Sequence, residues 1–107
     1  MASTKAYLTF VLDQLSELEG VTYRAMMGEY ILYYCGRVFG GIYDDRLLVK
    51  PVPAACAMLP HAPMEKPYPG GREMLLVDSV EDRALLHALV EAMYDQLPTP
   101  GKRKGRG

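Results

Sequence analysis

The chain has 107 residues and a mass of 11.9 kDa, which suits a single domain folding around its own hydrophobic core without disulfide or metal staples. Half of its residues are hydrophobic and the mean hydropathy is −0.04, which excludes wholesale disorder. Residues 102–107 hold four basic side chains and no acidic one, so residues 1–101 carry eight basic and thirteen acidic side chains, a net charge of −5.

Cellular location is predicted from what the sequence lacks. No apolar run approaches the roughly 20 residues that cross a membrane, so no membrane partner is expected. The N-terminal M-A-S-T-K-A-Y is not followed by the apolar segment and cleavage site of a secretory signal. Cys35 and Cys56 are expected to be free thiols. We therefore expect a cytoplasmic protein.

The first predicted element is a helix, which Ser3 or Thr4 can cap. Its apolar residues recur at the three- and four-residue spacing of one helix face: Leu8, Val11, Leu12, Leu15 and Leu18. Gly20 is expected to stop the helix. Tyr7 and Phe10 lie off this stripe, and they either widen the buried face or meet a partner.

A run of short strands follows, rich in Tyr, Val, Ile, Leu and Phe and separated by turn-forming residues. The predicted strands are 21–26, 30–34, 37–43 and 46–50. The expected turns are Met27-Gly28-Glu29, Cys35-Gly36 and Asp44-Asp45. Cysteine accepts a positive φ less readily than Asn or Asp, so slight strain is expected at Cys35. Gly40-Gly41 inside the third strand leaves room for a bulge or a close backbone contact.

The strand 30–34 has no polar alternation, which predicts that both of its faces are at least partly covered. Helices account for one face. The other face carries either Tyr30, Leu32 and Tyr34 or else Ile31 and Tyr33. It is covered by a further layer or a second subunit, or it is left as an exposed aromatic ladder. The sequence leaves both alternatives, and a homodimer among them, open. In the first strand, Arg24 is expected to point away from the face that holds Tyr23 and Ala25. The candidate interaction residues are Tyr30, Tyr33, Tyr34, Arg24 and Arg46.

The second half of the chain predicts a short helix at 53–59, an irregular connection at 61–71, a fifth strand at 73–77 and a last helix. Asp78 or Ser79 can cap the last helix, and Pro98 ends it. Its apolar stripe is Leu85, Leu86, Leu89, Val90, Met93 and Leu97. His87 is expected to be exposed and to pair with Glu91 four residues on.

The predicted element order is therefore α-β-β-β-β-α-β-α. It defines an α+β, two-layer sandwich with a mainly antiparallel sheet of about five strands and helices packed on it. Residues 1–98 form this domain, and residues 99–107 are expected to be a disordered basic tail.

No catalytic, cofactor or metal site is predicted. An enzyme or thiol sensor would have to use Cys35 or Cys56. No histidine lies near Cys35 in sequence, and the spacing supports no cysteine–histidine pair. His61 and Glu65 lack the further ligands that a metal needs. Weak, salt-sensitive binding of nucleic acid is an alternative, through four tail residues and with help from Arg24, Arg37 and Arg46 if these align across the strands. The four tail residues are Lys102, Arg103, Lys104 and Arg106.

The strand run resembles a known family. The segments 26–30, 32–33, 43–47 and 49–51, with their Gly-Glu-Tyr and Asp-Asp-Arg-Leu motifs, are similar to the N-terminal domain of the TfoX/Sxy competence regulators. The likeness extends through Lys-Pro-Tyr-Pro-Gly at 66–70 and the last helix, over about residues 13–104. Met27 stands where that family usually has Phe, and Cys35 where Asp or Asn usually makes the turn.

The resemblance implies a short, single-domain member with a two-layer fold similar to that of secretion chaperones, among which dimers are common. Longer TfoX proteins have a second, C-terminal domain and regulate DNA-uptake genes alongside a transcription activator. The 107 residues end instead at a basic tail, so competence regulation is not carried over directly. We expect a regulatory or protein-interaction module with an unknown protein partner and no cofactor.

Overall fold

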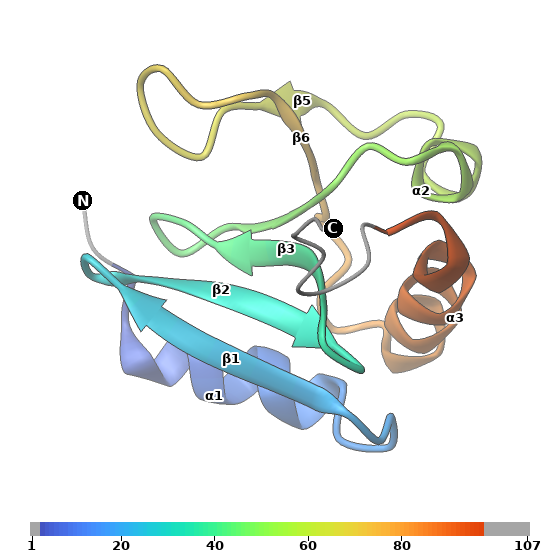
Figure 1. The fold of residues 1–107 in the computed structure, drawn as a ribbon, viewed down its shortest axis with the longest axis horizontal. Helices are drawn as coiled ribbons and strands as arrows, with labels where there is room; N and C mark the ends of the chain where they lie inside the picture. Colours follow the sequence, from blue (N-terminus) through green and yellow to red (C-terminus); the bar gives the residue numbers. More distant parts are fainter. Residues whose placement is uncertain (1–2, 98–107) are drawn as a thin grey trace, which may run out of the picture.

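The computed structural model describes residues 3–97, which form one antiparallel sheet with helices on it (Figure 1). The sheet has six strands in the order β1-β2-β3-β4-β6-β5. Its strands are β1 (Val21–Met26), β2 (Glu29–Tyr34), β3 (Arg37–Ile42), β4 (Leu47–Val49), β5 (Met64–Glu65) and β6 (Met74–Leu76). The helices are α1 (Lys5–Gln14), α2 (Pro53–Met58) and α3 (Arg83–Met93), and a 3-10 turn, η1 (Tyr94–Gln96), follows α3. The predicted α+β sandwich is confirmed.

Two-residue turns join β1 to β2, β2 to β3 and β3 to β4. Both central residues of each turn have positive φ. The turns are Met27-Gly28, Cys35-Gly36 and Asp44-Asp45. This backbone matches the right-handed twist of hairpin strands. The first turn lies within the predicted segment 27–29, at its first two residues. Cys35 adopts a φ of 51°, in the left-handed region that a cysteine rarely occupies.

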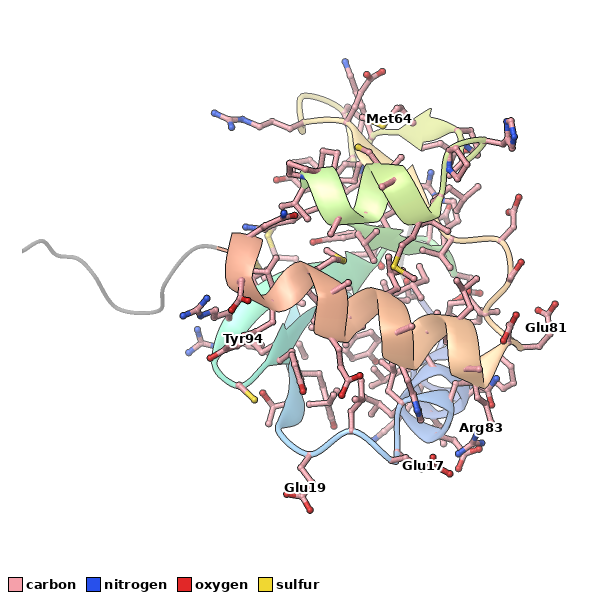
Figure 2. All side chains as sticks on the ribbon, turned by 90° about the vertical axis from the view of Figure 1, so that its right-hand side faces the viewer. Glu17, Glu19, Met64, Glu81, Arg83 and Tyr94 are labelled. Carbon is pink, nitrogen blue, oxygen red and sulfur yellow. The ribbon has the colours of Figure 1, made fainter. Side chains whose placement is uncertain are left out.

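The helices cover one face of the sheet. Strand pairing places Tyr23, Leu32, Gly40, Val49, Leu75 and Met64 in one cross-strand row on this face. The inner members of that row meet Leu8, Val11 and Leu15 of α1 and Leu86, Leu89 and Val90 of α3 in a single core. Figure 1 shows α1 alongside β1 and β2, and Figure 2 shows α2 and α3 side by side.

The middle of β3 is shaped by a bulge and two glycines. Leu32 pairs with Gly40 while Tyr33 pairs with Val38, so Phe39 is the additional residue of β3, and it is fully buried in the core. A Cβ at Gly40 would overlap the carbonyl oxygen of Leu48 on β4. Both predicted features of the Gly40-Gly41 region are therefore present: the backbone of β4 approaches closely at Gly40, and a bulge lies beside it at Phe39.

The helix boundaries differ from the prediction. Thr4 caps α1, as expected, by accepting a hydrogen bond from the Tyr7 amide. The helix ends at Gln14, because irregular turns replace the last turn that the Leu15 and Leu18 spacing suggested. Asp82, and neither Asp78 nor Ser79, caps α3. None of the described helices is long and apolar enough to cross a membrane.

The segment 61–71 was expected to lack regular structure, and that prediction is wrong. Met64–Glu65 forms β5, a sixth strand at the edge of the sheet, paired with β6. An ion pair between Arg46 and Glu65 and a hydrogen bond from the Leu76 amide to the Pro63 carbonyl hold it there. These contacts are tertiary, so a two-residue strand between prolines left no pattern in the local sequence.

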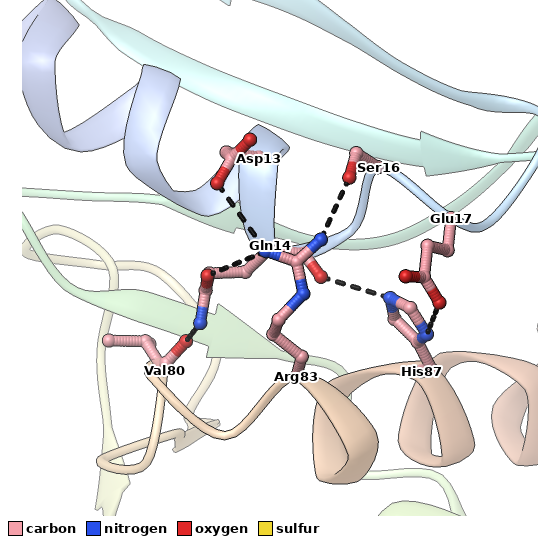
Figure 3. A network of polar contacts seen from close by, with 7 residues as sticks. All are labelled: Asp13, Gln14, Ser16, Glu17, Val80, Arg83 and His87. Atoms are coloured by element: carbon pink, nitrogen blue, oxygen red, sulfur yellow. Dashed lines mark hydrogen bonds and ion pairs between the residues drawn. The ribbon is translucent and has the colours of Figure 1, made fainter.

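His87 makes contacts other than the predicted one. Its Nε2 lies 3.0 Å from the carbonyl oxygen of Gln14, and its Nδ1 lies 3.9 Å from Glu17 (Figure 3). The ring is therefore half-buried at the end of α1 and is not paired with Glu91. In the same network, the buried Gln14 donates to the Val80 carbonyl at 2.8 Å and Arg83 donates to Ser16 at 3.0 Å, so the end of α1 is joined to the start of α3.

Candidate interaction surface

The second face of the sheet carries no helix in the described part of the chain. Arg24, Ile31, Gly41, Leu48 and Leu76 form one row across it, and Thr22, Tyr33 and Val38 form a second row. As predicted, Arg24 lies on the face opposite Tyr23 and Ala25.

The segment between β5 and β6 covers part of this second face. The ring of Tyr68 packs edge-on against Tyr43, with 6.2 Å between centroids, and Tyr43 in turn lies over Gly41. Leu48, which pairs with Gly41 on this face, is fully buried. Burial also raises the pKa of the Tyr43 hydroxyl, and the neighbouring Tyr68 adds to this effect.

The uncovered remainder lies on β1, β2 and the first half of β3. We call it the open patch, and its members are Thr22, Arg24, Ile31, Tyr33 and Val38. The first two are exposed and the other three are half-buried. The Arg24 guanidinium makes no hydrogen bond or ion pair with any residue between 3 and 97. The patch is thus apolar with one available cation.

The five residues predicted for interaction do not share one surface. Tyr33 and Arg24 belong to the open patch. Tyr30 and Tyr34 lie on the helix-covered face, where each packs against the core and against another tyrosine ring. Tyr30 meets Tyr23 at a centroid distance of 5.9 Å, and Tyr34 meets Tyr94 at 5.5 Å. The strand 30–34 therefore has two aromatic faces with different surroundings.

Arg46 and Arg37 are both occupied by contacts within the domain. Arg46 pairs with Glu65 and donates to the carbonyl oxygens of Tyr43 at 3.1 Å and Lys66 at 3.3 Å. Arg37 lies over the Tyr94 ring, 4.2 Å from its centroid, and donates to the Tyr94 carbonyl at 2.9 Å. Neither guanidinium aligns with Arg24, so the predicted row of three arginines does not form.

The residues of the Gly-Glu-Tyr and Asp-Asp motifs join two hairpin turns to the start of α1. The Glu29 carboxylate accepts hydrogen bonds from the amide and hydroxyl of Ser3 and from the Asp44 amide. Asp45 accepts from the amide of Thr4 at 2.8 Å, and its own amide donates to the Ser3 hydroxyl at 3.0 Å. We call these five residues the turn cluster. Their side chains stabilise the fold, which explains why the motif is informative without being a catalytic set.

The two thiols belong to different elements, Cys35 to the turn between β2 and β3 and Cys56 to α2. Each sulfur atom lies near a backbone carbonyl oxygen. Cys35 Sγ lies 3.9 Å from the Glu19 carbonyl, and Cys56 Sγ lies 3.6 Å from the Pro51 carbonyl. Both cysteines are free and exposed, as expected. Within residues 3–97 no three His, Cys, Asp or Glu side chains gather as they would around a metal ion. The predicted tail residues, Lys102, Arg103, Lys104 and Arg106, lie outside the described residues.

Fold and surface together define a small α+β sandwich domain with a half-covered antiparallel sheet and a carboxylate cluster that ties its hairpin turns together. The model of the family described as TfoX N-terminal domain matches residues 13–96. The chain belongs to this family, as its motifs predicted.

A relative from Spirochaeta aurantia is 33% identical over 107 residues, covering 99% of this chain and 93% of the relative. Its name is "Uncharacterized 12.7 kDa protein in trpE 5'region". No solved structure matches the chain significantly.

Proposed function

We propose that the protein is a non-enzymatic regulatory module of the TfoX N-terminal type that acts by binding another protein through the open patch. The observation that carries the proposal is the unequal covering of the sheet. Three helices pack on one face, whereas Arg24, Ile31, Tyr33 and Val38 on the other face have no covering element within residues 3–97. A tyrosine ring flanked by aliphatic side chains and an arginine is the composition that protein interfaces favour.

Charge indicates the chemistry of the partner. Arg24 is an available cation on a chain whose residues 1–101 carry a net charge of −5. Lys50, directly after β4, is a second cation, and partial burial lowers its pKa. A partner surface with apolar side chains and a carboxylate opposite Arg24 would complement this face, and repulsion by the acidic remainder would orient it.

Membership of the TfoX family supports the regulatory part of the proposal. Control of competence genes is the finer form of this role, and its test is the expression of DNA-uptake genes in cells that lack the protein. The non-enzymatic part is supported by the turn cluster, because its carboxylates accept hydrogen bonds that hold the fold. The cytoplasm is the proposed location.

Nucleic-acid binding has weaker support as an alternative. Arg37 and Arg46 are engaged with Tyr94 and Glu65, which leaves Arg24 as the only one of the three arginines available to a phosphate among the described residues. Titration of DNA and RNA at low and moderate salt decides this alternative, because counterion release makes such binding strongly salt-dependent.

The experiment is affinity capture from the native cell with the full chain as bait. Tyr33→Ala and Arg24→Glu, separately and together, are compared with wild type. The matched control is Tyr68→Ala, which removes a tyrosine that is 58% exposed but lies outside the open patch. We expect the double variant to lose at least tenfold of the captured partner while Tyr68→Ala retains it.

One further variant tests the role of the basic tail. A chain lacking residues 98–107 is expected to capture the partner as well as wild type does. Capture that survives the Tyr33→Ala and Arg24→Glu double variant, or that disappears on removal of residues 98–107, would contradict the proposal. Circular dichroism of each variant confirms that the fold is kept.

A further inference from the structure

The two edges of the sheet are unequal. At one edge β5 has two residues, flanked by Pro63 and Pro67. At the other edge β1 has six residues and pairs only with β2 among residues 3–97. Natural sheets protect edge strands by shortening them or by placing proline and charge on them. The edge at β5 is protected in this way, and β1, with Arg24 as its one charged residue, is not.

The backbone of β1 offers a regular set of free hydrogen-bonding groups at this edge. The pair Met26 and Glu29 closes a two-residue hairpin, so the amides and carbonyls of Thr22, Arg24 and Met26 face β2. The hydrogen bond from the Cys35 amide to the Gly20 carbonyl continues the same alternation. The amides and carbonyls of Val21, Tyr23 and Ala25 therefore face outward, and they are arranged symmetrically about Tyr23.

An apolar groove adjoins the same residues on the helix-covered side. Three leucines and a serine form one wall (Leu12, Leu15, Ser16 and Leu18), Val21–Tyr23 forms the other, and the volume is about 490 Å³. Exposed apolar side chains border the groove and the edge: Tyr23 is 45% exposed, Met26 48% and Met27, at the hairpin tip, 96%. The free edge and the groove thus form one continuous surface.

We propose that a second copy of this chain pairs on β1, antiparallel and about a two-fold axis through Tyr23, so that two sheets become one. A strand whose outward groups are symmetric about its central residue pairs with itself without leaving any of them unmatched. Two copies of the groove meet at the same axis, and their leucine walls cover each other. A second copy is therefore favoured over an unrelated extended peptide, which would cover the edge and leave the groove open.

Side-chain chemistry selects the register. With the axis at Tyr23, the two Tyr23 rings lie opposite each other, Val21 lies opposite Ala25 of the second copy, and Thr22 lies opposite Arg24 of the second copy. A shift that moved the axis to Arg24 would place two guanidinium groups directly opposite each other, which is unfavourable. In the Tyr23 register, the Met27 hairpin tip approaches the Leu18 wall of the other copy.

The pairing bears on the proposed function without depending on it. Because the axis is perpendicular to the sheet, the open patches of the two copies lie side by side on one face. Binding of a two-fold symmetric partner, or of two identical partner segments, would then be strengthened by avidity.

The test is the mass of the full chain by light scattering and by sedimentation, from micromolar to near-millimolar concentration. Wild type is expected to reach twice 11.9 kDa and to approach 11.9 kDa on dilution. Tyr23→Lys places two ammonium groups at the axis and is expected to weaken association at least tenfold. Ala25→Pro removes an outward amide that has no partner within one copy and is expected to act in the same direction.

Met64→Lys is the matched control. Met64 stands at the opposite end of the same cross-strand row as Tyr23, is 42% exposed, and lies far from Glu19 beside the β1 edge (Figure 2). It is expected to dimerise as wild type does. A constant 11.9 kDa for wild type at the highest concentration, or equal dimerisation of Tyr23→Lys and Met64→Lys, would overturn the inference. Tyr33→Ala tests the open patch separately, since it is expected to lose the partner and keep the mass.

Discussion

Tyr33 and Tyr34 are neighbours in one strand and have different surroundings. Tyr34 packs edge-on against Tyr94 at 5.5 Å and contacts the core, whereas Tyr33 stands in the open patch between Thr22 and Val38. Both residues are tyrosines, and their surroundings differ only because successive side chains of a strand point to opposite faces of the sheet. One aromatic face therefore stabilises the domain, and the other is available for recognition.

Two adjacent residues of β3 also point to opposite faces of the sheet, and substituting them should give the largest difference in the free energy of unfolding. Phe39 is fully buried in the core, and Val38 lies in the open patch. Phe39→Ala is expected to lower the free energy of unfolding by about 3–5 kcal/mol, and Val38→Ala by about 1 kcal/mol or less because its side chain is only half-buried. Urea denaturation measures both. Equal losses would show that the two faces of the sheet are equally packed.

In the turn cluster, a carboxylate outside the hydrophobic core supports the fold. Glu29→Gln replaces one acceptor oxygen with the NH₂ group of an amide, which is a donor and is placed against the donors of Ser3 and Asp44. We expect a loss of about 1–3 kcal/mol in unfolding free energy. Glu73→Gln, at an exposed position before β6, is the control and is expected to change stability by less than about 0.5 kcal/mol. Equal behaviour of the two variants would remove the structural role assigned to Glu29.

The smallest effect concerns Lys50 and depends on pH. Partial burial lowers its pKa from the ordinary value of 10.5, so the folded state binds this proton less tightly than the unfolded state does. The resulting penalty is present at neutral pH and disappears as the pH rises from the lowered pKa to 10.5. Lys50→Met should therefore raise the free energy of unfolding at pH 7, by less than about 1 kcal/mol because the side chain is only partly buried and solvent screens its charge.

Comparing urea denaturation of Lys50→Met and wild type at pH 7 and near pH 10 tests this sign. The stabilisation is expected to shrink at the higher pH, and tyrosine ionisation cancels because both proteins share it. A gain that grew with pH would mean that burial does not penalise the Lys50 charge.

Much of the fold follows from local chemistry. Turn-forming pairs at Cys35-Gly36 and Asp44-Asp45 and the apolar runs between them predict the hairpins, and Thr4 predicts the start of α1. The Gly-Glu-Tyr and Asp-Asp-Arg-Leu motifs predict the family to which the domain belongs. The sequence does not predict which tyrosines of β2 face the helices, because an unbroken apolar strand does not indicate which of its faces the helices cover.

The remaining differences come from tertiary contacts. Asp78, Ser79 and Asp82 can all cap a helix, and only in the folded chain does Asp82 accept from the Leu85 amide. Glu91 lies at helical spacing from His87, yet the end of α1 offers the Gln14 carbonyl instead. The strand β5 depends on the ion pair between Arg46 and Glu65, two residues that are far apart in sequence.

The central claim is that recognition uses the open patch and not the helix-covered face. The most direct measurement is an NMR titration of the isotope-labelled chain with the captured partner, following the amide signals of β2 and the ring signals of Tyr33 and Tyr34. The account predicts that Arg24, Ile31 and Tyr33 shift first and furthest while Tyr34 and the residues of α3 stay unchanged. Shifts concentrated at Tyr34 and α3, with the open patch unaffected, would contradict it.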